Sequence, residues 1–179
     1  YIGDNRDKVG FFNEDATIAW IKDYISKNHI KGEDILFSFH GGEPFLCGLD
    51  KMQKVCDAFP SSSFDATTNL IFPASKMTSI IGFIEKNFRA PEDNIPFVKT
   101  SWDYRIRFQS NEQEKLFWNN VRSLSENDIH VEVITCLTSE LIHGVTPEDY
   151  LSLMDRNGVR FLNFERLTAN TTQDEALIP

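Results

Sequence analysis

The sequence predicts an α/β fold in which parallel strands alternate with helices. Short apolar runs recur along the chain, a polar turn follows each run, and an amphipathic stretch follows each turn. Alternation of this kind is typical of parallel strands joined by right-handed helical crossovers. The pattern leaves two architectures open, namely an open doubly wound sheet and part of a barrel.

The first predicted helix runs from Asn13 to about Asn28. Asn13 is a suitable cap, and Glu14 and Asp15 suit the positive end of a helix. The apolar run 35–39 follows, and its composition fits a strand that is buried on both faces. The apolar stripe of the helix consists of Ile18, Ile21 and Ile25.

The next two units repeat this plan. Residues 64–69 are a weaker strand by propensity alone, and a helix is predicted after Pro73. The apolar face of the helix before residue 64 is spaced i, i+3, i+4, i+7 and consists of Met52, Val55, Cys56 and Phe59. The apolar face of the helix after Pro73 consists of Met77, Ile80, Ile81 and Ile84.

The second half of the chain contains three further predicted strands. They are residues 97–101, the β-branched run 131–135 and residues 159–164. A helix between the first two has the apolar residues Phe117, Val121 and Leu124. The segment 146–149 begins another helix, because it offers a threonine cap, a proline in the first turn and two acids. Strand ends therefore fall near residues 42, 69, 102, 137 and 165.

The composition fits one domain over residues 1–179. Hydrophobic residues make up 41% of the chain, and no apolar run approaches the roughly 20 residues of a bilayer-spanning helix. The net charge of -9 would repel a phosphate backbone, so neither nucleic acid nor a membrane is an expected partner.

The three cysteines, Cys47, Cys56 and Cys136, match no metal or redox spacing. We expect ordinary thiols, no metal ligand in this chain and a cytoplasmic location.

Candidate site residues are those that end the strands, because ligands bind there in both architectures. Gly41 and Gly42 allow backbone to approach a ligand closely, and a carboxylate directly after them, Glu43, can hold a cationic group. The alternative is a tight turn with a solvated glutamate. Further polar groups recur at the later strand ends, and they are Asn69, Ser101, Asp103, Arg105 and Arg107.

The segment 37–44 resembles the radical S-adenosylmethionine (SAM) superfamily, whose second strand commonly ends in a GGEP motif. Residues 68–69 are similar to the family's TN element, and residues 100–103 resemble its serine–aspartate element. Later units at 131–138 and 164–168 follow in the family's order. The resemblance thus covers nearly the whole chain, and it is to members of the GGEP type that resemble peptide and sulfatase maturases.

The resemblance implies a partial (β/α)6 TIM-like barrel, which selects between the two architectures. It also implies a four-iron four-sulfur cluster on three cysteines spaced CxxxCxxC, which binds SAM and supplies an electron. Cleavage of SAM then gives methionine and a 5′-deoxyadenosyl radical that takes a hydrogen atom from a substrate. A peptide or protein is the implied substrate, and an external donor such as flavodoxin or ferredoxin is the implied source of electrons.

The implied SAM contacts fall on the strand-end residues. A zwitterion needs an acceptor for its ammonium and donors for its carboxylate, and these residue types supply both. From the SAM amino group to the adenine the contacts are Gly41, Gly42, Glu43, Asn69, Ser101, Asp103 and Leu137, with Arg107 at the carboxylate.

The CxxxCxxC motif is absent from the sequence. We expect the cluster loop and the first strand to precede Tyr1, which makes this chain an incomplete core domain that alone binds no cluster and is inactive. One alternative is a degenerate barrel without a cluster that serves as a binding or scaffold domain. Another is an unrelated enzyme in which Glu43 and Asp103 face each other as acid and base.

Overall fold

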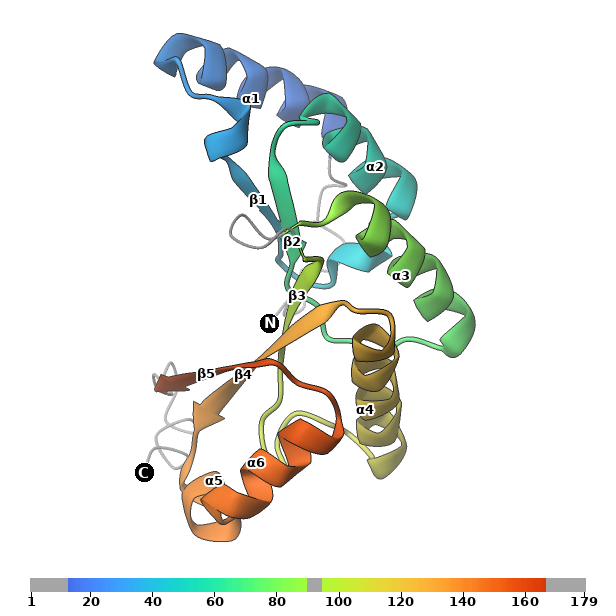
Figure 1. Ribbon diagram of the computed structural model, residues 1–179, viewed down its shortest axis with the longest axis vertical. Helices are drawn as coiled ribbons and strands as arrows, with labels where there is room; N and C mark the ends of the chain where they lie inside the picture. Colours follow the sequence, from blue (N-terminus) through green and yellow to red (C-terminus); the bar gives the residue numbers. More distant parts are fainter. Residues whose placement is uncertain (1–12, 90–94, 167–179) are drawn as a thin grey trace, which may run out of the picture.

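The fold is an alternation of helices and parallel strands (Figure 1). The computed structural model describes residues 13–89 and 95–166. The helices are α1 (Glu14–Asn28), α2 (Leu49–Ala58), α3 (Ala74–Asn87), α4 (Asn111–Glu126), α5 (Ser139–Gly144) and α6 (Pro147–Arg156). The strands are β1 (Leu36–Phe39), β2 (Ser63–Ala66), β3 (Phe97–Ser101), β4 (His130–Leu137) and β5 (Phe161–Arg166). The predictions for Tyr1 and for residues 167–168 lie outside the described ranges.

The strands pair in parallel and follow one another in chain order. β1 pairs with β2, and β4 pairs with β3 on one side and β5 on the other. The two small sheets meet at a parallel bridge between Thr67 and Lys99, where Thr68 N donates to Lys99 O at 2.9 Å. The predicted α/β class with parallel strands is confirmed, whereas closure into a partial barrel stays a prediction. Because all five strands run the same way, their carboxyl ends lie at one edge.

The hydrophobic core lies between the strands and the helices that line one side of them (Figure 1). Val98 and Thr100 of β3 are buried on that side, as are Val131 and Val133 of β4. The residues between them in sequence are only partly buried. Successive side chains of a strand point to opposite faces. We call the face away from the helices the open face of the strands.

Side-chain caps define where the predicted helices begin. Asn13 accepts from Ala16 N at 3.1 Å at the start of α1, and Thr146 accepts from Asp149 N at 3.1 Å at the start of α6. Each bond satisfies one backbone donor that the first turn leaves free. Pro147 then occupies the first turn of α6. Both predicted helix starts are confirmed.

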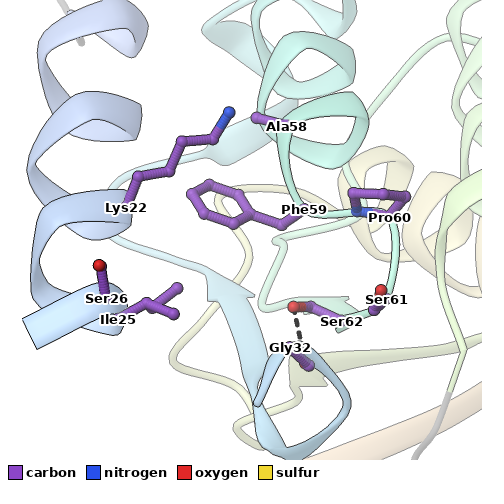
Figure 2. A pocket seen from close by; sticks show the side chains of 9 residues that line it. All are labelled: Lys22, Ile25, Ser26, Gly32, Ala58, Phe59, Pro60, Ser61 and Ser62. Atoms are coloured by element: carbon purple, nitrogen blue, oxygen red, sulfur yellow. Dashed lines mark hydrogen bonds between the residues drawn. The ribbon is translucent and has the colours of Figure 1, made fainter. Parts of the chain in front are cut away.

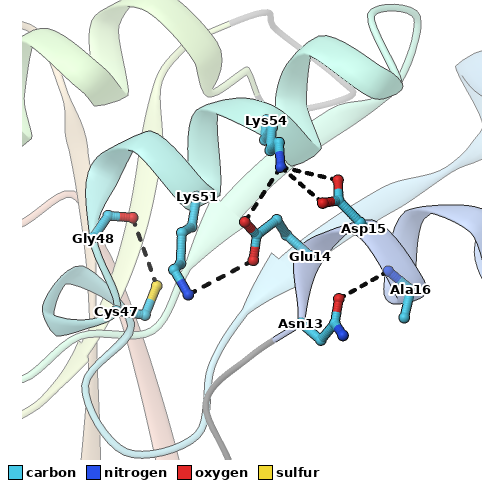
Figure 3. Close-up of polar contacts among 8 residues, drawn as sticks. All are labelled: Asn13, Glu14, Asp15, Ala16, Cys47, Gly48, Lys51 and Lys54. Carbon is cyan, nitrogen blue, oxygen red and sulfur yellow. Dashed lines mark hydrogen bonds and ion pairs between the residues drawn. The ribbon is translucent and has the colours of Figure 1, made fainter.

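The first turn of α1 is joined to α2 by ion pairs (Figure 3). Glu14 lies 3.7 Å from Lys51 Nζ and 3.4 Å from Lys54 Nζ, and Asp15 lies 2.9 Å from Lys54 Nζ. None of the residues of α1 is fully buried, and its three isoleucines pack only partly against the core. Trp20 and Tyr24 stack on the exposed side of the helix, with ring centroids 5.8 Å apart. The attachment of α1 is therefore partly electrostatic.

A pocket of about 260 Å³ opens at the amino ends of β1 and β2 (Figure 2). Phe59 lines it, with Lys22 Nζ 5.8 Å from its ring centroid, and Ser62 Oγ donates to Gly32 O at 2.8 Å. These residues precede the strands, whereas the candidate site residues follow them. The pocket is thus at the opposite end of the strands from the candidate site.

Three differences between the observed and the predicted elements have a clear local cause. β2 ends at Ala66, because the chain turns after it and Leu70 has a φ of 54°. β5 begins at Phe161, because Val159 N still donates to Met154 O as part of the turn that ends α6. The short helix α5 was not predicted, since it has only six residues.

Candidate functional site

The strand-end residues gather at one edge of the sheets. Thr67 is level with Lys99 on the neighbouring strand, and Asn69 and Ser101 each follow two residues later. Ser101 is in turn level with Ile134 of β4, and Trp102 N donates to Ile134 O at 2.9 Å. β1 leads to the same edge, because Thr67 N donates to Phe39 O at 2.9 Å just before the glycine turn. We call this edge the rim.

The glycine turn after β1 has a backbone conformation that favours glycine. Gly41 has a φ of 91° and Gly42 a φ of 66°, values that L side chains rarely adopt. A Cβ placed on Gly41 would find no atom within 4 Å, so the space in front of this peptide is open. The turn therefore exposes backbone groups at the rim without a side chain to cover them.

Glu43 joins the first two loops of the rim. Its carboxylate accepts from Thr68 Oγ1 at 2.9 Å and from Asn69 N at 2.7 Å, both in the loop after β2. It also accepts from Phe45 N at 3.3 Å, in the 3-10 turn Pro44–Leu46 that begins with Pro44. The alternative of a solvated glutamate in a free turn is therefore wrong. The carboxylate holds two loops in one arrangement.

The environment of Glu43 raises the pKa of its carboxyl group. Partial burial is the main cause, and it outweighs the hydrogen bonds from Asn69 N, Thr68 and Phe45 N and the charge of Lys76, which lower the pKa. Burial removes water that would otherwise screen a charge. A cationic group placed beside this carboxylate thus gains more than it would beside a fully solvated one.

Asp103 joins the ends of β3 and β4. Its Oδ1 accepts from Cys136 N at 3.2 Å, and its Oδ2 lies 3.5 Å from Arg107 Nη1. The turn between the two residues is closed by Arg107 N, which donates to Asp103 O at 3.3 Å. Arg107 Nε is buried and has no hydrogen-bond partner among residues 13–89 and 95–166. A buried donor of this kind calls for an acceptor, and a ligand carboxylate is the partner whose geometry matches a guanidinium best.

The remaining predicted residues lie at or just after the ends of β2, β3 and β4. The Asn69 amide oxygen accepts from Ile71 N at 2.8 Å, a local turn that leaves the side-chain nitrogen available. Ser101 ends β3, and Leu137 ends β4 with 37% of its surface exposed. Arg105 lies apart from the Asp103 pair, with its guanidinium 4.9 Å from the centroid of the Tyr104 ring.

The predicted acid–base pair is not supported by the contacts of its members. Glu43 is bonded to the loop after β2, and Asp103 is bonded to the end of β4 and to Arg107. No contact in the described part of the chain links the two carboxylates. Each has a positioning role in its own loop.

Sequence reasoning missed two partners at the rim. Thr68 belongs to the TN element at residues 68–69, but its donation to Glu43 was not predicted. The backbone of Cys136 donates to Asp103, a contact that residue type does not reveal.

Burial and the neighbouring Asp103 raise the pKa of the Cys136 thiol to about 11, and burial raises the pKa of the Cys56 thiol to about 12. Both thiols are therefore protonated at neutral pH.

Metal ligands and membrane spans are both absent from the part of the chain that the structure describes. No group of three or more His, Cys, Asp or Glu side chains there could hold a metal ion. No helix in the described ranges is both long enough and apolar enough to cross a bilayer.

Comparison with known proteins finds similarity to solved structures. No family model and no curated protein matches the sequence. The structure of native anSMEcpe with bound AdoMet matches with a TM-score of 0.57 at 16% identity, over 76% of this chain and 40% of that one. Native anSMEcpe with bound AdoMet and Kp18Cys peptide matches with a TM-score of 0.55 at 16% identity, over 73% of this chain and 37% of that one. A histidine-tagged form of anSMEcpe with bound AdoMet gives a TM-score of 0.56 at 15% identity, over 76% and 38% of the two chains.

These matches establish a shared fold. The matched structures are of anSME, an anaerobic sulfatase-maturating enzyme of the radical SAM type. The chain spans less than half of the length of each matched structure.

Proposed function

We propose that this chain is part of the core of a radical SAM enzyme, with its SAM site at the rim. The proposal is supported by the groups that lie at the rim. An open glycine turn, a partly buried carboxylate and an arginine with an unpaired buried donor converge at the carboxyl ends of parallel strands. The fold that places them there is shared with enzymes whose structures contain AdoMet.

The rim has the groups that the amino acid part of SAM requires. The open space in front of Gly41 admits the ammonium, with the backbone of Gly41 and Gly42 and the Glu43 carboxylate as acceptors. Arg107 supplies donors for the SAM carboxylate, since in the described part of the chain its Nε has no partner and Asp103 contacts it at Nη1. The charges thus match those of a bound zwitterion.

The other rim residues orient the rest of the cofactor. Asn69 and Ser101 offer hydrogen-bonding groups along the methionine and ribose, and Asp103 keeps Arg107 in place through their ion pair. Leu137, partly exposed at the end of β4, covers the adenine and excludes water from one side of it. The role of these residues is to bind and orient SAM.

The iron–sulfur cluster does not fit the described residues, which contain no group of three metal-ligating side chains. We place its CxxxCxxC ligands, together with a first strand of a partial (β/α)6 barrel, in the sequence before Tyr1. When bound, the cluster would supply the electron that cleaves SAM, received from a donor such as flavodoxin or ferredoxin. We also propose that the enzyme is cytoplasmic.

A peptide or protein is the substrate that we propose. The support is a matched structure that contains both AdoMet and the Kp18Cys peptide.

The proposal is tested on the full-length protein, purified without oxygen and reconstituted with iron and sulfide. We expect a brown protein that binds SAM in a calorimetric titration and forms 5′-deoxyadenosine when reduced. Arg107→Ala should weaken SAM binding about tenfold or more, because a hydrogen bond to a charged group contributes roughly 1.5–3 kcal/mol. Arg105→Ala is the matched control and should change SAM affinity less than about twofold, since Arg105 lies against Tyr104.

Two results would overturn the proposal. One is a reconstituted, folded protein that neither binds SAM nor forms 5′-deoxyadenosine, which would favour the scaffold alternative. The other is an equal loss of SAM affinity in the two arginine variants, which would remove the rim as the binding site.

A further inference from the structure

The pocket at the amino ends of β1 and β2 lies apart from the rim (Figure 2). Its walls come from the second half of α1, from Gly32 before β1 and from the segment that joins α2 to β2. The residues that line it are Lys22, Ile25, Ser26, Gly32, Ala58, Phe59, Pro60, Ser61 and Ser62. None of them belongs to the rim, so the proposed function does not account for this pocket.

The inner part of the pocket is apolar. Phe59 is 7% exposed, and its ring centroid lies 4.8 Å from that of Phe37 of β1. Ile25 of α1 packs partly against the same core. Apolar walls that are open to water gain free energy when an apolar group covers them. The pocket therefore suits a ligand with an apolar body.

Lys22 gives the pocket a positive charge. The described lining contains no carboxylate, and Lys22 Nζ forms no ion pair within residues 13–89 and 95–166. Lys27 on the same helix, in contrast, pairs with Asp23 at 2.7 Å. The chain has 27 acidic and 18 basic residues, so a lysine without a carboxylate partner stands out. Its ammonium lies 5.8 Å from the centroid of the Phe59 ring and is free to pair with an anion.

Serine hydroxyls add hydrogen-bonding groups around the apolar part. Ser62 Oγ donates to Gly32 O at 2.8 Å, so its proton is already used. The hydroxyls of Ser26 and Ser61 have no hydrogen-bond partner in the described part of the chain. Both are therefore available to a ligand. Gly32 allows the two loops to come close, because a Cβ there would lie only 3.1 Å from Ser61 Cβ.

The volume of the pocket limits the size of its ligand. It is about 260 Å³, whereas an apolar cavity of about 150 Å³ is large enough to hold benzene. Pockets for drug-sized ligands are larger, at about 300–1,000 Å³. One ring, or an aliphatic chain of similar size, therefore fits together with a single charged group.

We propose that this pocket binds a small carboxylic acid with an apolar body. The carboxylate pairs with Lys22, the body lies against Phe59 and Ile25, and Ser26 and Ser61 offer hydrogen bonds to further polar groups. The inference goes beyond the proposed function and does not depend on it, since the pocket and the rim share no residue.

Such a ligand would attach the second half of α1 to the rest of the molecule. Ion pairs with Lys51 and Lys54 join only the first turn of α1 to α2, and no residue of the helix is fully buried. A ligand held between Lys22 and Phe59 adds contacts where the helix has few. A ligand that binds only the folded form also stabilises that form.

The test uses the full-length protein and three probes, namely benzoate, benzamide and acetate. Benzamide keeps the ring without the charge, and acetate keeps the charge without the ring. Calorimetric titration should give a Kd for benzoate of about 1 mM or lower, and at least tenfold weaker binding of the other two. Raising the salt concentration should weaken benzoate binding, because salt screens the pairing with Lys22.

Variants locate the binding in the pocket. Lys22→Met keeps the apolar stem of the side chain and should remove most of the preference for benzoate over benzamide. Lys27→Met is the matched control on the same helix and should change benzoate affinity by less than about twofold. Ser26→Leu, a change at an exposed residue of the lining, fills the pocket and should weaken both ring compounds at least tenfold. Circular dichroism checks the fold of each variant.

Hydrogen exchange gives a second readout. Saturating benzoate should slow exchange in residues 18–28 of the unaltered protein at least threefold and have no such effect in Lys22→Met. This result would show that the ligand contacts α1.

Three results would overturn the inference. They are the absence of saturable benzoate binding, equal binding of the three probes, and equal effects of the two lysine variants. Benzoate binding that survives Ser26→Leu would also contradict it, because the ligand would then lie elsewhere. A SAM titration of the same samples keeps the two proposals separate, since loss of benzoate binding leaves the assignment of the rim unchanged.

Discussion

At the residue scale, the Glu43 carboxylate holds the rim together. It accepts from donors in its own turn and in the loop after β2, at distances of 2.7 to 3.3 Å. The same loop after β2 contains Asn69, which we place beside SAM. A charged group that orders two loops before a ligand arrives reduces the entropy that binding would otherwise cost.

Glu43→Gln should lower the free energy of unfolding by about 1–3 kcal/mol, because an amide nitrogen would face a backbone donor and leave it unpaired in a partly buried place. Urea unfolding followed by circular dichroism measures the change. Glu33→Gln, a change at a side chain that is 71% exposed, is the matched control and should alter stability by less than about 0.5 kcal/mol. If the two variants unfolded at the same urea concentration, Glu43 would have no structural role in the rim.

At the element scale, α4 stabilises the loop after β2 through side-chain hydrogen bonds. Asn120 of α4 is buried, and its Nδ2 donates to Leu70 O at 2.9 Å and to Phe72 O at 2.8 Å. Leu70 has a φ of 54°, an unusual value for a residue with a side chain. The side chain of Asn120 thus stabilises a strained loop that leads out of the rim.

Asn120→Ala should destabilise the protein by about 2–3 kcal/mol, since two buried carbonyl groups lose their donor. Asn28→Ala is a matched control, because the Asn28 Nδ2 also donates to a backbone carbonyl, Tyr24 O at 2.8 Å, but in an exposed position. Thermal unfolding of the two variants compares them. A smaller shift in melting temperature for Asn120→Ala than for Asn28→Ala would show that the loop does not depend on α4.

At the scale of the whole molecule, stability is distributed unevenly over the fold. β4 pairs in parallel with β3 over residues 130–134 and with β5 over residues 132–137. Three of its residues, Val131, Val133 and Thr135, are wholly buried. In α1 no residue is fully buried, and its first turn is held by partly exposed ion pairs. Elements with few buried contacts open most readily.

Hydrogen exchange measured by mass spectrometry should therefore show the slowest exchange in β4 and much faster exchange in α1. The amides of β4 are expected to open only with global unfolding, whereas those of α1 open locally. Raising the salt concentration should speed exchange in α1 further, because salt screens its ion pairs with Lys51 and Lys54. Equal protection of the two elements would contradict this picture.

Local chemistry explains which features could be predicted. The caps at Asn13 and Thr146 and the apolar face of α3 follow from residue type and spacing, and the structure confirms them. The alternation of runs and turns also predicted parallel strands with their carboxyl ends at one edge, which brings Asn69 and Ser101 to the rim. The SAM contacts themselves stay a prediction.

The sequence by itself determined the order of helices and strands, the α/β class and the edge at which polar residues gather, because these depend on interactions within a few residues of one another. Only the tertiary structure decided which groups meet. The bond from Asn69 N to Glu43, the bond from Cys136 N to Asp103 and the pairing of Lys99 with Asp65 each join residues more than 20 positions apart. Residue type does not encode such contacts, since they arise from the register between neighbouring strands and the loops that follow it.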